Sequence, residues 1–378
     1  MTISFIVPLF RGQKYISEII NNINEMIDYL KNNDYKIELV FVNDDPGEKI
    51  VEIEEALSIG NVIIYNNETN IGIHASRVKG LELSSGQYVC FFDQDDYLDV
   101  SYLDKMIHCA INNNSDVVLC NGIYRSGRKI YDDDDAINAA VSNTEYFKSL
   151  ISIISPGQAF IRRNAIPEGW IKYILSGNYC DDAFLWLLLK ENDAKFDFVD
   201  DILYYHNENG HNQSFAWGNN AKALEELKLV INSNSLLCKE HLDDFLCAAN
   251  NEISKHRFYA NVDEKINYYI DHLDEFKWLL QKYMVEKLAI YGYGIIGKAF
   301  LGIVKEIKIG KVIAIDKNLQ YAEEVELYSL SEIIDSKKLE GVNDYSVIVT
   351  VGSGFEAIKN ELLKAGFKNI YSIEELLI

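Results

Sequence analysis

The sequence predicts an α/β protein whose first part folds around a parallel, doubly wound sheet. Over the first hundred residues, short apolar runs alternate with segments of helical spacing. This alternation is typical of parallel sheets covered by helices on both faces. Polar clusters at 43–45 and 93–96 follow the second and fourth expected strands. Sheets of this kind bind ligands at the carboxyl ends of their strands.

The elements follow in order from periodicity and turn residues. The first strand, 3–7, is expected to end at Pro8, and the apolar spacing of 16–30 predicts a helix that a turn at 32–34 follows. The further elements expected in this region are strands at 37–42, 62–65 and 88–92 and helices at 48–57 and 74–83. Beyond it we expect strands at 117–120, 158–161, 194–199 and 202–205, and an apolar helix at 181–190.

The chain divides into three expected regions: 1–215 with the first sheet, 216–286 with helical patterns and no strand signal, and 287–378 with a second, small α/β domain. In the last region, a strand at 288–291 runs into Gly292-Tyr293-Gly294-Ile295-Ile296-Gly297 and a helix. Further strands are expected at 312–315, before Asp316, and at 347–351. This glycine spacing, with an acid about 20 residues later, is that of a dinucleotide-binding loop.

Composition and charge argue against some classes of protein. The 378 residues carry a net charge of −22, which disfavours nucleic-acid binding. No basic region precedes the first strand, and no apolar run approaches the about 18 residues of a membrane span. Six cysteines without CxxC pairing indicate reduced thiols. We therefore expect a cytoplasmic protein, for which peripheral contact with the inner membrane face stays open.

The stretch Tyr88–Phe92 carries the strongest functional signal, because it runs directly into Asp93-Gln94-Asp95-Asp96. Three carboxylates at the end of a buried strand repel one another, so we expect a cation there. Oxygen ligands favour Mg²⁺ or Mn²⁺, which take further ligands from water and substrate phosphates. The cluster thus predicts a nucleotide-diphosphate substrate. The alternative is that these acids only cap the next helix, for which Asp96 or Asp99 alone would suffice.

Five short motifs in the first 215 residues resemble those of family 2 glycosyltransferases with the GT-A fold. They are Ile6-Val7-Pro8-Leu9-Phe10, Val42-Asn43-Asp44-Asp45, Asn70-Ile71-Gly72 with Ser76-Arg77 and Gly80, Ser85-Gly86-Gln87-Tyr88, and Phe92-Asp93-Gln94-Asp95-Asp96. Three positions depart from the family pattern: Arg11 stands in place of Asn, Asp45-Pro46 in place of Gly-Ser, and Val78 in place of Asn.

This resemblance implies a binding site for a nucleotide-diphospho-sugar donor. Its expected donor-binding residues are Pro8, Phe10, Asp44, Arg77, Asp93 and Gln94. Pro8 and Phe10 would flank the nucleobase and Asp44 would hydrogen-bond it, while Arg77 would lie beside the base and the phosphates. Asp93 and Asp95 match the DXD residues that hold ribose and the metal.

Two later matches extend the resemblance. Asp181-Asp182 matches an acidic pair whose second member is the general base, so Asp182 is the expected base and Asp181 the fallback. The segment His211-Asn212-Gln213-Ser214 resembles one whose histidine can approach the metal or the phosphates, and His211 is included among the expected metal-site residues. Simpler readings stay open: Asp182 as an ordinary first-turn acid, Arg77 in a surface ion pair, and His211 as a loop histidine.

The function that follows is a metal-dependent, inverting glycosyltransferase using Mn²⁺ or Mg²⁺. It would move a sugar from a UDP-sugar to a hydroxyl of a glycan or lipid-linked glycan acceptor in surface polysaccharide synthesis. Two alternatives remain: an NAD-dependent sugar oxidoreductase acting through the C-terminal domain, and a non-catalytic sugar-nucleotide-binding scaffold. We expect the C-terminal domain, which resembles small Rossmann-like nucleotide-binding domains, to serve assembly or nucleotide binding, including homo-oligomerisation, without redox chemistry.

Overall fold

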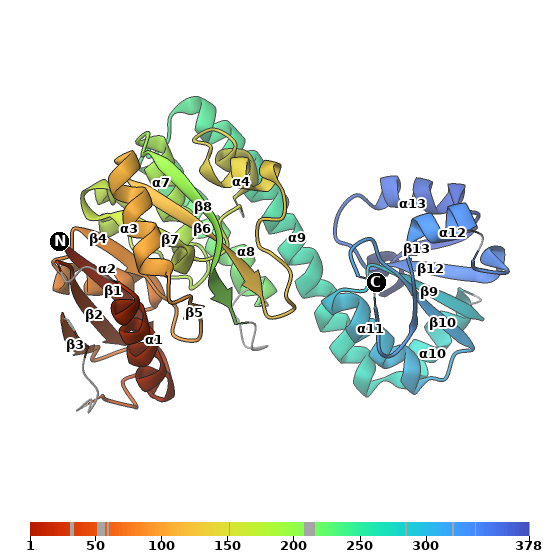
Figure 1. Cartoon of the computed structure of the whole chain (residues 1–378). Coiled ribbons are helices and arrows are strands. Elements are labelled where there is room, and N and C mark those ends of the chain that lie inside the picture. The colour runs from red at the N-terminus through yellow and green to blue at the C-terminus, as the bar shows by residue number, and fades with distance from the viewer. Residues whose placement is uncertain are drawn as a thin grey trace. The chain divides into compact units, whose positions relative to one another are not determined.

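A computed structural model describes residues 1–30, 34–50, 57–58, 60–150, 152–207, 216–283, 286–319, 321–336 and 338–377 (Figure 1). These residues form two compact units, Met1–Ile253 and Ser254–Ile378. The boundary falls inside one long helix, α9 (Lys239–Asp271). The expected helical segment is therefore divided, with α8 (Trp217–Ser233) in the first unit and α10 (Leu273–Lys282) in the second.

The first unit contains an eight-stranded sheet with the order β3-β2-β1-β4-β7-β6-β8-β5. The first four strands in the chain pair in parallel, as the sequence predicts, whereas β7 and β5 run antiparallel to their neighbours. The strands are β1 (Thr2–Leu9), β2 (Lys36–Asn43), β3 (Gly60–Asn66), β4 (Tyr88–Phe91), β5 (Tyr97–Leu98), β6 (Val117–Tyr124), β7 (Ala159–Arg162) and β8 (Phe196–His206).

Helices cover both faces of this sheet because successive strand residues point to opposite sides. On one face, Ile3, Phe5 and Val7 of β1 pack with α1 (Ile16–Tyr29) and α3 (Tyr102–Asn113). On the other face, Ile6 packs with α2 (Ile73–Leu83), and the same core continues to α7 (Asp181–Glu191), α8 and the start of α9. Shorter helices are α4 (Asp134–Val141), α5 (Tyr146–Ser149) and α6 (Glu168–Lys172). The GT-A-like α/β arrangement is thus confirmed.

Several expected elements differ from the observed ones. Strand β1 continues through Pro8, because β4 ends opposite Ile6 and leaves β1 paired on one side only at that point. The strands expected at 194–199 and 202–205 form the single strand β8, whose register against β6 shifts at Cys120 and Asn121. The described residues of the helix expected at 48–57, namely 48–50 and 57, are not helical, and 51–56 lie outside the described residues. So do two of the three residues of the turn expected at 32–34.

The second unit contains a fully parallel five-stranded sheet with the order β11-β10-β9-β12-β13. One face packs on α9, α10, α11 (Ile295–Glu306) and α14 (Ile373–Leu377), and the other on α12 (Leu330–Ser336) and α13 (Phe355–Lys364). Its strands are β9 (Lys287–Tyr291), β10 (Lys311–Ile315), β11 (Glu326–Tyr328), β12 (Tyr345–Val349) and β13 (Asn369–Ser372). The sequence had not indicated β11 and β13, which are edge strands of three and four residues.

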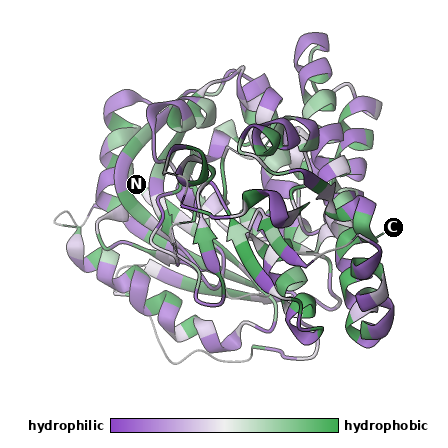
Figure 2. Cartoon of the chain, turned by 90° about the vertical axis from the view of Figure 1, so that its right-hand side faces the viewer, coloured by the Kyte–Doolittle hydropathy of each residue, from purple (hydrophilic) through white to green (hydrophobic). Residues whose placement is uncertain are grey.

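Apolar residues gather in the strands and on the inner sides of the helices, as Figure 2 shows by hydropathy. Among the described residues, no helix has both the length and the apolar character needed to cross a bilayer.

Replacing a helical glycine by alanine should have opposite effects on stability at two positions. A Cβ at Gly80 of α2 would lie 2.3 Å from Cγ2 of Ile6, whereas a Cβ at Gly302 of α11 meets nothing within 4 Å. We expect Gly80→Ala to lower the free energy of unfolding by about 1–3 kcal/mol through overpacking. Gly302→Ala should raise it by about 0.5–1 kcal/mol through helix propensity. Urea unfolding followed by circular dichroism tests both, and shifts of the same sign would contradict the packing of α2 on β1.

Candidate active site

The acidic cluster lies at the carboxyl edge of the first sheet, directly after β4. The chain leaves the strand where Phe92 N donates to Ile6 O at 2.9 Å, and Asp96 N closes a turn by donating to Asp93 O at 3.3 Å. Asp96 does not cap α3. Its carboxylate accepts hydrogen bonds from the hydroxyl of Tyr204 and from Asn207 N, the latter at 2.9 Å. The helix-capping alternative is therefore not what holds this carboxylate.

Arg77 of α2 is the centre of the site. Its Nη2 lies 2.6 Å from Asp93 Oδ1, and its Nη1 lies 2.5 Å from Asp181 Oδ2. The Arg77 side chain is only 4% exposed, and its guanidinium bridges the buried Asp181 and the half-buried Asp93. A surface ion pair, the simpler reading of Arg77, is thus wrong. The bridge joins α2, the end of β4 and the start of α7.

Burial and mutual repulsion raise the pKa values of the acids. Burial, followed by the charges of Asp96 and Asp93, raises the pKa of Asp95 to about 6. Burial also raises the pKa of Asp93, although Arg77 opposes the shift. For Arg77, the facing Asp181 and Asp93 outweigh the effect of burial and raise the pKa of the guanidinium. The site therefore holds more negative charge than its one buried arginine compensates.

The segment after β1 is tied to the acidic cluster through Gln94. The Gln94 side-chain amide donates from Nε2 to Phe10 O at 3.2 Å and accepts at Oε1 from Phe10 N at 3.0 Å. This pair fixes the backbone and leaves 46% of Phe10 exposed. Arg11 then has a φ of 51°, a left-handed conformation that Asn tolerates better than Arg. This left-handed backbone explains why asparagine suits position 11, where the family pattern has it.

Asp44, at the end of β2, organises the loop before α2. Its Oδ1 accepts from Asn67 Nδ2 and Ile71 N, and its Oδ2 accepts from Gly72 N, all at 2.8 Å. The carboxylate is 5% exposed. Asp44 therefore holds the loop that leads into α2 and Arg77, whatever further contact it makes with a ligand.

The acidic pair opens α7, as expected, and its two members differ. Asp181 is buried and paired with Arg77, and Trp170 Nε1 donates to its backbone oxygen at 2.7 Å. Asp182 accepts from Ala183 N at 2.7 Å. Burial, followed by the charge of Asp181, raises the pKa of Asp182 to about 7. A carboxylate whose pKa lies near neutrality is suited to accept a proton.

A buried histidine fixes the approach to this pair. Leu175 N donates to His74 Nδ1 at 2.9 Å, so the proton lies on Nε2, which donates to Trp170 O at 3.0 Å. Burial lowers the pKa of His74, in keeping with this neutral tautomer. His74 therefore ties α2 to the 170–175 segment.

Sequence reasoning missed Tyr204 and His206, which extend the cluster from the end of β8. His206 Nδ1 lies 3.0 Å from the Tyr204 hydroxyl and 3.3 Å from Asp96 Oδ1. A signal was present, since two polar-tipped aromatic residues at i and i+2 share one face of a strand. Ser155, whose hydroxyl lies 3.4 Å from Asp93 Oδ2, was also missed. The expected metal-site residue His211 lies outside the described residues.

The glycine loop of the second unit is held by its own chain. Asp316 Oδ2 accepts from Tyr293 N at 2.7 Å, and Oδ1 accepts from Asn318 N at 2.8 Å. The Thr350 hydroxyl donates to Gly292 O at 2.6 Å. Asp316, the acid expected to hold a ribose hydroxyl, thus binds the glycine loop through Oδ2 and the turn that follows Asp316 in the chain through Oδ1. Redox chemistry gains no support from these contacts.

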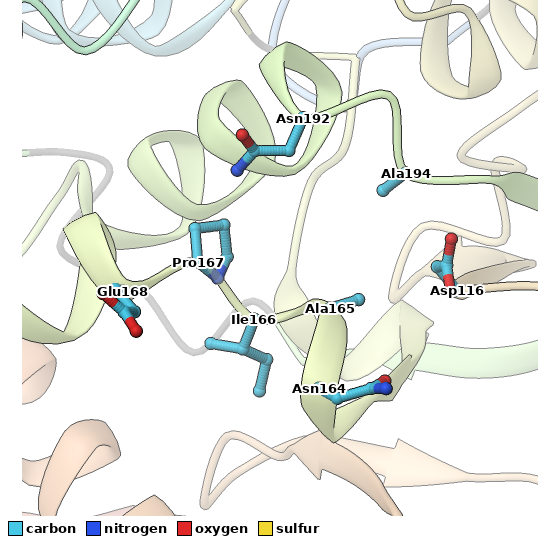
Figure 3. A pocket seen from close by; sticks show the side chains of 8 residues that line it. All are labelled: Asp116, Asn164, Ala165, Ile166, Pro167, Glu168, Asn192 and Ala194. Atoms are coloured by element: carbon cyan, nitrogen blue, oxygen red, sulfur yellow. The ribbon is translucent and has the colours of Figure 1, made fainter.

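A pocket of about 430 Å³ lies elsewhere in the first unit. Figure 3 shows Asp116, Asn164, Glu168 and Asn192 around it, with apolar residues between them. Asp116 directly precedes β6 and Ala194 precedes β8, so this pocket lies at the amino ends of strands. The acidic cluster is at their carboxyl ends, so the two sites are separate.

Comparisons with known proteins agree with this arrangement. Residues 4–170 match the family model described as glycosyl transferase family 2. The putative glycosyltransferase EpsH of Bacillus subtilis is 28% identical over 121 residues, which cover 32% of this chain and 33% of that protein. The poly(ribitol-phosphate) beta-N-acetylglucosaminyltransferase TarP of Staphylococcus aureus is 24% identical over 213 residues, or 54% of this chain and 62% of that protein.

The chain spans about a third or less of the length of the first curated relatives it matches. Among solved structures, residues 1–349 of S. aureus TarS give a TM-score of 0.50 at 20% identity. This likeness covers 65% of this chain and 71% of that one. It shows the shared fold.

The buried bridge predicts a large stability effect. Arg77→Met should leave Asp93 and Asp181 close together without their cation, and lower the free energy of unfolding by about 3–5 kcal/mol at neutral pH. Urea unfolding measures it. The matched control is Lys79→Met on the same helix, whose ion pair with Glu82 is exposed and should matter little. Equal effects of the two substitutions would contradict the role assigned to the bridge.

Proposed function

Since residues 4–170 form a family 2 glycosyltransferase domain, we propose that this protein transfers a sugar from a UDP-type nucleotide-diphospho-sugar to a hydroxyl of a glycan acceptor. The observation that carries the proposal is the bridge from Asp93 through Arg77 to Asp181. It joins the strand-end acids, suited to hold a cation beside a donor diphosphate, to the helix that begins with the candidate base. We further propose that transfer proceeds with inversion, because one base, Asp182, serves the attacking hydroxyl.

The donor edge has features that suit a nucleotide. Phe10 exposes an aromatic ring on a backbone that Gln94 fixes, and exposed rings stack on bases. Pro8 lies in the same strand end. Asp44 holds the neighbouring loop. In this proposal Phe10 and Pro8 flank the base, and Asp44 contacts it with the acceptor capacity that remains on Oδ2.

The acids fit a divalent cation. Burial, together with the charges of neighbouring carboxylates, raises the pKa values of Asp93 and Asp95. A cation would favour the ionised carboxylates, and the ligand atoms that they offer are hard oxygens. We propose that Asp93 and Asp95 hold Mn²⁺ or Mg²⁺, with His206 nearby on β8 and His211 as a further candidate. The chemistry that such a cation supplies is neutralisation of charge on the leaving diphosphate. Arg77 orients Asp93 for this task, and its charge favours the ionised carboxylate against the effect of burial.

Asp182 is the proposed general base, and Asp181 the less favoured candidate. Asp181 already shares its charge with Arg77 in a buried pair, which weakens it as a proton acceptor. Asp182 has a pKa of about 7 and opens the same rigid helix. It would take the proton of the acceptor hydroxyl as that oxygen attacks the anomeric carbon.

The relatives' names favour a cell-surface polymer as the acceptor. Two of them, TarP and TarS, are named N-acetylglucosaminyltransferases acting on poly(ribitol phosphate), and GgaB of B. subtilis is named for minor teichoic acid biosynthesis. We therefore propose a polyol-phosphate or other surface glycan, free or lipid-linked, as the acceptor of this chain.

Donor binding should depend on the metal. With Mn²⁺ present, calorimetric titration of UDP should give tight binding, which EDTA weakens. Asp95→Asn should reduce the Mn²⁺-dependent affinity by about 10–100-fold or more. The affinity should also rise as the pH rises through about 6, because protonated Asp95 cannot ligate a cation. Asp135→Asn, which alters an exposed acid of α4, is the control. Equal UDP affinity with Mn²⁺ and with EDTA would refute the metal claim.

Removing the base should affect turnover and spare donor binding. Asp182→Asn keeps the size of the side chain and should lower kcat by about 10²–10⁴-fold, with the UDP affinity unchanged. In the unaltered protein, kcat should rise with pH up to about 7 and then level, because the base acts when deprotonated. UDP release from UDP-sugars in the presence of acceptor measures both. If Asp181→Asn abolished turnover and Asp182→Asn left it normal, the general base would be Asp181 and not Asp182.

A further inference from the structure

A second cluster with metal-binding chemistry lies at the far end of α7, away from the residues assigned to transfer. Glu191 is the last residue of α7, Cys238 directly precedes α9, and His241 lies in the first turn of α9. One ligand atom from each of the three lies within 4.8 Å of the others. Cys238 and His241 are three residues apart in a helical turn, where Leu242 N donates to Cys238 O, and so share one face.

Several contacts hold these side chains in place. Glu191 Oε1 accepts from Cys238 N at 2.9 Å, and Oε2 lies 2.7 Å from His241 Nδ1. The His241 ring stacks on the buried Phe147 of α5, with centroids 4.0 Å apart and planes 9° apart. The neighbouring Lys190 donates to Ala140 O and Ser142 O and fixes the end of α7. The carboxylate and the imidazole are therefore already oriented toward each other.

We propose that Glu191, Cys238 and His241 bind Zn²⁺. A thiolate with an imidazole and a carboxylate is a donor set that selects zinc over Mg²⁺ or Mn²⁺. Bonds of about 2.0–2.3 Å place tetrahedral ligand atoms about 3.3–3.7 Å apart, so the present distances need shifts of about 1 Å. Thiolate and carboxylate together balance the charge of the ion. Cys238 is exposed, which gives the ion a route in and leaves a fourth position for water.

The bound ion would fasten the end of α7 to the start of α9. Because α7 begins with Asp181 and Asp182, this attachment supports the helix that carries the proposed base from its opposite end. The metal here differs in chemistry from the one proposed at Asp93 and Asp95. The proposal of zinc binding at this cluster can therefore be tested independently of the proposal of sugar transfer.

The test is metal binding by the full-length protein, stripped with EDTA and kept reduced. One equivalent of Zn²⁺ should bind per chain, and an excess of Mg²⁺ should not displace it. Bound Zn²⁺ should raise the Tm of the protein. Co²⁺ in its place should give a thiolate-to-cobalt charge-transfer band. Cys238→Ser should abolish the band and weaken Zn²⁺ binding by at least about 100-fold. Cys247→Ser, which alters another exposed cysteine of α9, is the matched control and should change neither.

Glu191→Gln gives a second readout, because it keeps an acceptor for Cys238 N but removes the charge. It should weaken Zn²⁺ binding and leave the Tm without metal nearly unchanged. Absence of the cobalt band, or its persistence in Cys238→Ser, would overturn the proposal and leave the three residues as a hydrogen-bonded joint between helices. Equal loss in the Cys247→Ser control would overturn it as well.

Discussion

The burial of Arg77 between Asp93 and Asp181 is the interaction on which the first unit depends. One guanidinium pairs with both carboxylates and so joins α2, the end of β4 and the start of α7 at this point. Without that cation, the buried Asp181 would be uncompensated beside the half-buried Asp93, which is strongly destabilising. Arg77 pairs with Asp93 and Asp181, and in the proposed metal site a cation would compensate the further carboxylates at the strand end.

The sequence predicted the parts of this site that depend on local pattern. The acids after Tyr88–Phe92 and at the start of α7 are visible because each follows or opens an apolar run. The partner of Arg77 was not visible, since Asp181 lies 104 residues away and nothing local couples them. Tyr204 and His206 were missed because Asp200 and Asp201 interrupt the apolar pattern of β8, which suggested two short strands.

The direction of the later strands could not be predicted either. β7 runs antiparallel to both β4 and β6, and periodicity carries no information on pairing direction. In the second unit the strand, glycine loop and helix expected from residue 288 onward were correct in kind, yet Asp316 and Thr350 already bind the loop backbone. A glycine spacing predicts a backbone conformation, and the side chains around it decide what can bind.

The hydrogen bonds that Gln94 makes to Phe10, and Asp44 to the 67–72 loop, have a thermodynamic consequence. Both loops are ordered by the protein's own side chains. Ordering a side chain or loop upon association typically costs about 0.5–1.5 kcal/mol for each immobilised group. A donor entering this edge meets that order already in place. The protein should therefore lose little conformational entropy when a donor binds. The fixed shape of these loops, and not a rearrangement upon binding, would then determine which donors fit.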